Sequence, residues 1–307
     1  MSKRPIIIDT DPGIDDAIAI AIALFSEELD VRLITTVAGN VGLENVTNNT
    51  LKLLAFWQKD VPVAKGAARP LVLPLIDAAN VHGLSGMDGY DFPSPAKHNL
   101  LSIHAVEAIY QELVSSKEKI TLVPIAPLTN IALLLRMHPD AVEYIEEIVL
   151  MGGSTTRGNK GVMSEFNIAT DPEAAKIVFD CGLPIVMVGL DVGWKALVYR
   201  EDSDKIMQMG ATGEMMVSLF QKYRSGTFNT GLKMYDPCVM AYLLQPEMFE
   251  VIPGVVDIEL DGKMTKGMTI VDFRGYLGDR PKNARVCVDI DGQMFRQWLL
   301  ASIAACL

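Results

Sequence analysis

The segment that decides the fold is IIIDTDPGIDDAIAIAIALF, residues 6–25, in which a short apolar run, an acidic turn and a longer apolar run follow one another. The first run has the length and composition of a buried strand, whereas the second is long enough for a helix. Between them lie four aspartates, Asp9, Asp11, Asp15 and Asp16. Carboxylates crowded between two buried elements repel one another and resist desolvation unless a cation, a helix N-terminus or both offset their charge.

Helix capping accounts for only part of this cluster. Asp15 or Asp16, at the start of the predicted helix, would be favoured by the helix dipole and by the free N–H groups of the first turn. The other aspartates need a different explanation, and several hard oxygen ligands in one place are typical of a Ca²⁺ or Mg²⁺ site. We therefore interpret the acidic turn as a metal site.

The rest of the chain continues the alternation of strand and helix. Apolar runs rich in valine, isoleucine and leucine predict strands at residues 31–39, 61–67, 119–127, 145–153 and 183–191. Helical patterns lie between them at residues 42–58, 102–116, 127–139 and 171–182. This order is typical of an α/β fold with an open, mostly parallel sheet that helices cover on both faces. No low-complexity linker or repeat interrupts the chain, so we expect a single domain over residues 1–307.

Composition restricts the class of protein. The formal net charge of −11 argues against nucleic acid or an anionic membrane as the main partner. The longest apolar run, residues 17–25, is far shorter than the ~20 residues of a membrane span, and the start of the chain lacks the apolar stretch of a secretory signal. Four widely spaced cysteines without a C-x-x-C motif suit reduced thiols. We expect a cytoplasmic protein.

Polar residues recur at the carboxyl ends of the predicted strands, where open α/β sheets bind their ligands. Asn40 follows the second strand, the turn around Ile125 follows ITLVP, and Asp191 follows IVMVGL. Asn159 and the segment SEFN, residues 164–167, come after IVLMGG. Together with the acidic turn, these residues predict one ligand site at one edge of the sheet.

Seven blocks along the chain resemble the inosine–uridine nucleoside hydrolase family, and more narrowly its ribonucleoside hydrolase members with broad purine and pyrimidine scope. The blocks are DTDPGIDDA, TTVAGN, VHGLSGMDG, PIAPLTNIALLL, IVLMGG, SEFNIATDPEAA and YDPCVMAYLL. They begin in the acidic turn and reach the C-terminal region, so the resemblance covers essentially the whole chain. It implies the nucleoside hydrolase fold, small-molecule ribonucleosides as partners, and a homodimer or homotetramer.

The resemblance also implies a role for each matching residue. Asp11 would be the general base and a ligand of calcium. Asp16 and Asp236 would supply further carboxylates to the ion, and Ile125 a backbone carbonyl. The residues implied to hold the ribose hydroxyls are Asp15, Asn40, Asn159, Glu165 and Asn167.

The sequence departs from the family pattern at Tyr235, in KMYDP. Many members have a histidine here, which is credited with protonating the leaving base. A phenol with an ordinary pKa near ~10 is a poor acid at pH 7. His82, in VHGLSGMDG, is the other candidate on the base side, and Tyr223 and Arg224, in KYRSG, could form a wall of the base pocket.

These residues leave three functions open. The main hypothesis is calcium-dependent hydrolysis of the N-glycosidic bond of ribonucleosides, in which Asp11 accepts a proton from water and the carboxylates favour positive charge on the ribose. The second is a nucleoside- or ribose-binding protein with little turnover, because Tyr235 replaces the histidine. The third is a metal phosphohydrolase built on D-x-D, which would need a basic residue for the phosphate and a later acidic pair.

Overall fold

The computed structural model describes residues 3–306, which form an α/β fold around a nine-stranded sheet. The strand order is β11-β10-β12-β6-β5-β4-β1-β2-β3. From β12 to β3 every neighbouring pair is parallel, whereas β10 is antiparallel to both β11 and β12. The strands are β1 (Arg4–Thr10), β2 (Leu29–Thr36), β3 (Val63–Lys65), β4 (Ile120–Pro124), β5 (Ile145–Met151), β6 (Ile185–Val188), β10 (Phe249–Ile258), β11 (Thr269–Asp272) and β12 (Ala284–Ile290).

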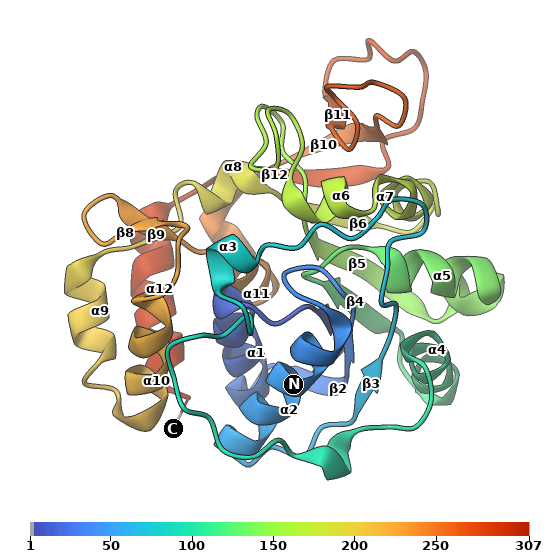
Figure 1. Cartoon of the computed structure of the whole chain (residues 1–307). Coiled ribbons are helices and arrows are strands. Elements are labelled where there is room, and N and C mark those ends of the chain that lie inside the picture. Colours follow the sequence, from blue (N-terminus) through green and yellow to red (C-terminus); the bar gives the residue numbers. More distant parts are fainter. Residues whose placement is uncertain (1–2, 307) are drawn as a thin grey trace.

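Helices cover both faces of this sheet, as predicted (Figure 1). On one face lie α4 (Ala105–Ser115), α5 (Thr129–Met137) and α7 (Pro172–Phe179). On the other lie α1 (Ile14–Phe25), α2 (Leu43–Trp57), α10 (Gly210–Phe220), α11 (Asp236–Leu244) and α12 (Gly292–Ala304). The shorter helices are α3 (Ala79–His82), α6 (Phe166–Thr170), α8 (Leu190–Gly193), α9 (Arg200–Ile206) and the 3₁₀ turns Lys97–Asn99, Pro139–Glu143 and Pro246–Met248.

Two hydrophobic cores result, one on each face, and β1 contributes to both. Because successive side chains of a strand point to opposite faces, Ile6 and Ile8 lie in the core with α1, and Ile7 lies in the core with α4 and α5. The same alternation continues to the end of the strand. Thr10 donates a hydrogen bond toward α1, whereas Asp9 accepts one from α5. The strand therefore delivers polar groups to both faces at its carboxyl end.

Helix α1 is buried along nearly its whole length, from Ile14 to Ala23. Alternating isoleucine and alanine make it apolar on every side, as suits a helix enclosed between the sheet and a second layer formed by α10, α11 and α12. Gly13 caps its N-terminus, and the Asp16 carboxylate accepts the Gly13 N–H at 2.9 Å. The acidic residues of its first turn thus lie at the positive end of the helix dipole.

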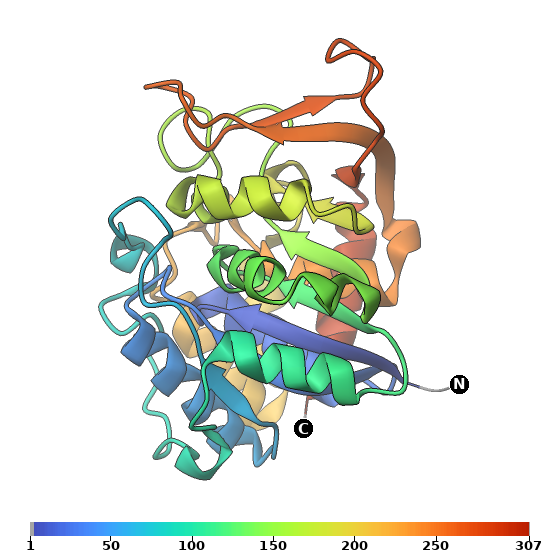
Figure 2. The same ribbon diagram turned by 90° about the vertical axis from the view of Figure 1, so that its right-hand side faces the viewer.

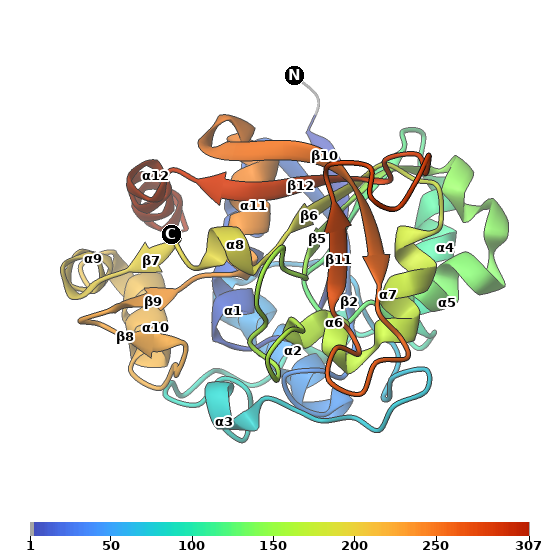
Figure 3. The same cartoon turned by 90° about the horizontal axis from the view of Figure 1, so that it is seen from above.

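The chain after β6 adds strands that we did not predict. A small antiparallel sheet, in the order β7-β9-β8, lies beside α9 and α10 (Figure 3). Its strands are β7 (Leu197–Val198), β8 (Gly226–Thr227) and β9 (Gly231–Lys233). The hairpin of β10 and β11 extends from one end of the molecule (Figure 2). No helix within residues 3–306 is long and apolar enough to cross a membrane.

Candidate active site

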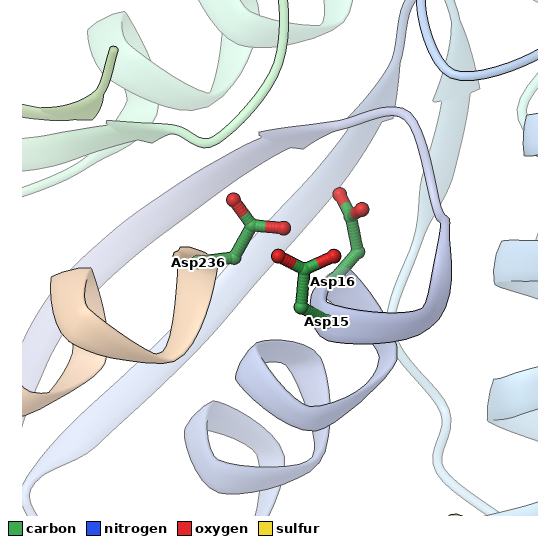
Figure 4. Close-up of side chains that lie close together, drawn as sticks. All are labelled: Asp15, Asp16 and Asp236. Carbon is green, nitrogen blue, oxygen red and sulfur yellow. The ribbon is translucent and has the colours of Figure 1, made fainter. Parts of the chain in front are cut away.

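Three buried carboxylates lie together where α1 and α11 begin (Figure 4). Asp15 and Asp16 come from the first turn of α1, and Asp236 is the first residue of α11. One oxygen of each lies within 4.8 Å of the others, close enough for all three to hold one metal ion. We call Asp15, Asp16 and Asp236 the acidic cluster.

Hydrogen bonds fix the orientation of the acidic cluster. Asp16 accepts the Thr10 hydroxyl at 2.6 Å through Oδ1, and the Asn40 side-chain amide at 3.2 Å through Oδ2. Asp15 Oδ2 accepts the backbone N–H of Tyr235 at 3.4 Å. These donors are all neutral, so they orient the carboxylates without cancelling their charge.

The electrostatics of the acidic cluster call for a cation. Burial raises the pKa of Asp15 to about 6. Burial, followed by the charges of Asp15 and Asp16, raises the pKa of Asp236 well above its usual range. In the part of the chain that the structure describes, no lysine or arginine forms an ion pair with any of the three. Acceptor-only oxygens in this number suit a hard divalent ion.

Asp11 lies next to the acidic cluster but outside the group of three. Its Oδ2 accepts the backbone N–H of Asn40 at 2.6 Å, and its carbonyl accepts the Asn40 side-chain amide at 3.1 Å. Burial and the neighbouring charge of Asp16 raise its pKa well above the usual range. A Cβ at Gly39 would lie 2.1 Å from Asp11 Oδ2, so only glycine allows the chain to pass this carboxylate so closely.

Asp9 supports the site from the opposite face of β1. Its Oδ1 accepts the Thr35 hydroxyl at 2.6 Å and the Asn130 side-chain amide at 2.7 Å. Its Oδ2 is buried without a hydrogen-bond partner, and burial raises its pKa to about 7. Thr35 and Asn130 are supporting residues that the sequence analysis missed, because they join Asp9 only through the fold.

A cavity of about 320 Å³ opens beside the acidic cluster, at the carboxyl ends of the strands. That volume lies in the range of small-molecule sites. Four of the residues predicted for the site do not line this cavity: Asp9, Asp11, Asp16 and Asp191. The predicted residues that line it are Asp15, Asn40, His82, Ile125, Asn159, Glu165, Asn167, Tyr223, Arg224, Tyr235 and Asp236.

Glu165 is held by the loop that carries it. Its carboxylate accepts the backbone N–H groups of Asn167 at 2.9 Å and of Ile168 and Gly153 at 3.1 Å each, so it caps α6 and closes the loop of residues 153–165. Burial raises the pKa of Glu165 to about 7. Asn159, at the exposed tip of this loop, accepts the Phe166 N–H at 2.9 Å.

The Asn167 side chain connects two neighbouring strand ends. Its amide donates to the carbonyls of Met151, at 3.2 Å, and of Ile125, at 3.4 Å. The Ile125 carbonyl predicted to face an ion therefore lies at the cavity, within reach of this amide.

The opposite wall is aromatic. His82 Nδ1 accepts the backbone N–H of Ile14 at 3.1 Å, so the proton of the neutral ring is on Nε2. Burial lowers the pKa of His82 to about 4, which keeps the ring neutral. The Tyr223 ring lies 5.4 Å from it, and burial raises the pKa of Tyr235 above its usual value. Burial also raises the pKa of Tyr223 well above its usual value, so both phenols and the imidazole are neutral hydrogen-bond donors.

Two basic residues of the cavity were missed. Lys160 and Lys233 line it together with the predicted Arg224, and we call these three residues the basic rim. Lys233 carries no motif; it ends β9, two residues before Tyr235. Asp191, grouped with the site in the sequence analysis, does not line the cavity; it accepts the N–H and hydroxyl of Thr155 at 2.9 and 2.6 Å.

Comparison with known proteins agrees with this geometry. The model of the family described as inosine-uridine preferring nucleoside hydrolase matches residues 6–297. The non-specific ribonucleoside hydrolase RihC of Klebsiella pneumoniae is 52% identical over 98% of this chain and 99% of its own. The non-specific ribonucleoside hydrolase RihC of Escherichia coli is 50% identical over 99% of this chain and 100% of its own.

A solved structure has the same fold over the full chain. The purine-preferring ribonucleoside hydrolase from Gardnerella vaginalis superposes with a TM-score of 0.90 at 28% identity, covering 99% of both chains. The fold, the acidic site at the strand ends and these full-length matches lead to one conclusion: the chain belongs to the inosine-uridine preferring nucleoside hydrolase family.

Proposed function

We propose that this protein hydrolyses the N-glycosidic bond of purine and pyrimidine ribonucleosides, releasing ribose and the free base, with Ca²⁺ held at the acidic cluster. The observation that carries the proposal is a buried, uncompensated group of carboxylates beside a cavity lined with hydroxyl-binding amides and carboxylates. The full-length identity to RihC, a non-specific ribonucleoside hydrolase, supports the reaction and the substrate class.

The residues at the strand ends fit a hard cation. Asp11, Asp16, Asp236 and the Ile125 carbonyl are the proposed ligands, and Asp15 is a further candidate because its oxygen belongs to the acidic cluster. When bound, the cation polarises the attacking water and offsets the carboxylate charges. The donor set of oxygens alone is the kind that calcium prefers.

The side chains then divide the reaction between them. Asp11 accepts the proton of the attacking water, whose oxygen bonds to C1′ as the C1′–N bond breaks. The carboxylates around the ribose favour the positive charge that develops there. The residues that we propose to hold the ribose hydroxyls are Asp15, Asn40, Asn159, Glu165 and Asn167.

The base occupies the aromatic wall in this proposal. His82 Nε2–H and the Tyr235 hydroxyl donate hydrogen bonds to it, and Tyr223 and Arg224 flank it. A hydrogen bond from a neutral donor orients the base without transferring a proton. We therefore expect turnover to depend on how well each base leaves.

The hydrolase is favoured over the two alternatives from the sequence. A nucleoside-binding protein without turnover would not need the complete set of Asp11, Asp16 and Asp236 beside a cavity. A phosphohydrolase is at odds with the family, whose named relatives act on nucleosides.

The test is release of free ribose from inosine, adenosine, uridine, cytidine and xanthosine, measured with Ca²⁺, after chelation, and after addition of Mg²⁺ or Ca²⁺ to the chelated enzyme. We expect chelation to abolish ribose release and Ca²⁺ to restore it. Phosphate release from nucleotides without ribose release would contradict the proposal. Tight nucleoside binding without any turnover would favour the binding protein.

We further propose that the protein works in the cytoplasm as a homodimer or homotetramer. The family resemblance supports the assembly, and the four free cysteines Cys181, Cys238, Cys287 and Cys306 support a reducing compartment. Sedimentation of the purified enzyme and cell fractionation test the two statements separately.

A further inference from the structure

The basic rim is unusual for this chain. Lys160, Arg224 and Lys233 line one cavity in a protein with a formal net charge of −11. Arg224 is exposed and the two lysines are partly exposed. Within residues 3–306 none of the three forms an ion pair. Their charges are therefore available to whatever fills the cavity.

Two of these cations share a wall with the aromatic residues. Lys233 lies in β9, two residues before Tyr235, whose backbone N–H bonds Asp15 at 3.4 Å. Lys233 also lies close to Arg224, because its backbone N–H bonds the carbonyl of Ser225 at 3.0 Å. Arg224 follows Tyr223, and its backbone N–H bonds the Val81 carbonyl at 3.2 Å, beside His82.

Lys160 belongs to a different wall. It follows Asn159 in the loop of residues 153–165, and its ammonium lies 5.2 Å from the centre of the Phe166 ring. The cavity is thus negative at the acidic cluster and positive along the wall of Arg224 and Lys233.

This polarity matches the charge that separates during the reaction. As the C1′–N bond breaks, positive charge develops on the ribose and the bonding electron pair moves to the base nitrogen. With the ribose beside the acidic cluster, the base lies along the wall that carries Arg224 and Lys233. The match rests on the proposed function, because it requires cleavage of a ribonucleoside in this cavity.

We propose that Lys233, assisted by Arg224, stabilises negative charge on the departing base. The base keeps the electron pair of the broken bond, leaves as an anion, and takes a proton from water afterwards; the proton lost by the attacking water goes to Asp11. Preformed charge aimed at developing charge is an electrostatic form of transition-state stabilisation. The preferred substrates are then ribonucleosides whose free base is the more acidic at the glycosidic nitrogen.

The test compares 5-fluorouridine, uridine and 5-methyluridine, which share a ribose and a ring shape but release progressively weaker acids. Single-turnover rates and KM are measured for the wild type and for Lys233→Met. We expect the variant to lose roughly tenfold to a hundredfold in rate on 5-methyluridine, and clearly less on 5-fluorouridine. Lys233→Arg keeps the charge and should recover most of the rate. Arg224→Met should show the same trend more weakly.

The matched control is Lys222→Met. Lys222 is exposed, stands two residues before Arg224 and does not line the cavity. Its replacement by methionine removes one positive charge, as Lys233→Met does. It should keep the wild-type ratios among the three substrates. Thermal melting of each variant shows whether it is folded.

The outcomes separate this inference from the proposed function. Equal losses on all three substrates for a folded Lys233→Met, or a change in KM alone, would overturn the role of Lys233 and leave the hydrolase intact. A wild-type enzyme that releases no ribose from any substrate with Ca²⁺ present would overturn the proposed function itself.

Discussion

The acidic cluster and the basic rim serve one cavity but are built in different ways. The cluster is buried, begins two helices, and is oriented by hydrogen bonds from β1, from the turn after β2 and from the backbone at Tyr235. The rim stands on a loop, a turn and a short strand; Arg224 is exposed, and Lys160 and Lys233 are partly exposed. Residues on a rigid interior fix the chemistry, whereas exposed segments can change at little cost in stability. The comparison suggests that reaction type and choice of base are encoded in separate parts of the molecule.

The strongest test of the buried, acidic part of the site is a substitution at Asp11. We expect Asp11→Asn to lower the rate of ribose release by at least about a thousandfold, because the amide keeps the size of the side chain but cannot accept the proton of water. In the calcium-free protein the fold should survive and the melting temperature should not fall, since a buried carboxylate without an opposite charge is removed. Steady-state kinetics and thermal melting measure both effects. Activity within tenfold of the wild type would remove Asp11 as the general base.

Removal of the metal ion tests the acidic cluster through its effect on thermal stability. An ion that binds only the folded chain stabilises it by about 2.7 kcal/mol when its concentration is a hundred times the dissociation constant. We expect added Ca²⁺ to raise the melting temperature and a chelator to lower it, with Asp236→Asn much less responsive than the wild type. An equal response in that variant would place the ion elsewhere.

Tyr235 lies between the acidic cluster and the basic rim. Its backbone N–H bonds Asp15 at 3.4 Å, and the residue also lines the cavity. Tyr235→Phe keeps the ring and removes the hydroxyl, so we expect a loss of about tenfold, the value of one hydrogen bond near ~1.4 kcal/mol. Tyr235→His should raise turnover of purine nucleosides if a missing acid limits them. Rates on inosine and uridine for both variants decide the point; unchanged rates for the phenylalanine variant would exclude a role for the hydroxyl.

The smallest effect is expected at a residue outside both groups. The Thr269 hydroxyl, on β11, donates to the Ser154 carbonyl at 2.5 Å and accepts its N–H at 2.9 Å, and so positions the start of the loop that carries Glu165. Thr269→Val should cost about 1–2 kcal/mol in unfolding free energy and raise KM roughly threefold at constant kcat. Thr269→Ser is the control that keeps the hydroxyl. A fall in kcat with unchanged KM would contradict a purely positioning role.

The parallel part of the sheet was predictable because its strands are continuous apolar runs. All of the predicted strands and helices up to residue 191 are present, most with shorter bounds, whereas β1 is longer than predicted and β2 begins two residues earlier. β10 escaped notice because Pro253 and Gly254 interrupt it. The structure tolerates this proline because β11 pairs only with residues 255–258, so β10 is an edge strand at Pro253.

Site residues were predictable where the residue type alone indicates the chemistry. They were not predictable where only the position in the folded structure brings a residue to the site. Four crowded aspartates stand out in any sequence. The family resemblance added Glu165 and Asn167 to the predicted site. Lys233 resembles any surface lysine until the fold turns it toward the cavity. Asn130 meets Asp9 across a separation of 121 residues, a contact that no local pattern contains.

The alternation of side-chain direction along β1 also restricts which insertions and deletions this segment can accept. Ile7 and Asp9 face one core, whereas Ile8 and Thr10 face the other and lead to Asp16. Inserting or deleting a single codon within residues 4–10 would exchange the two faces, bury the wrong side chains in both cores and turn the carboxylates away from their partners. A change in length within this segment would therefore disrupt both cores and the site at once, so insertions in natural variants should accumulate in the loops around the cavity.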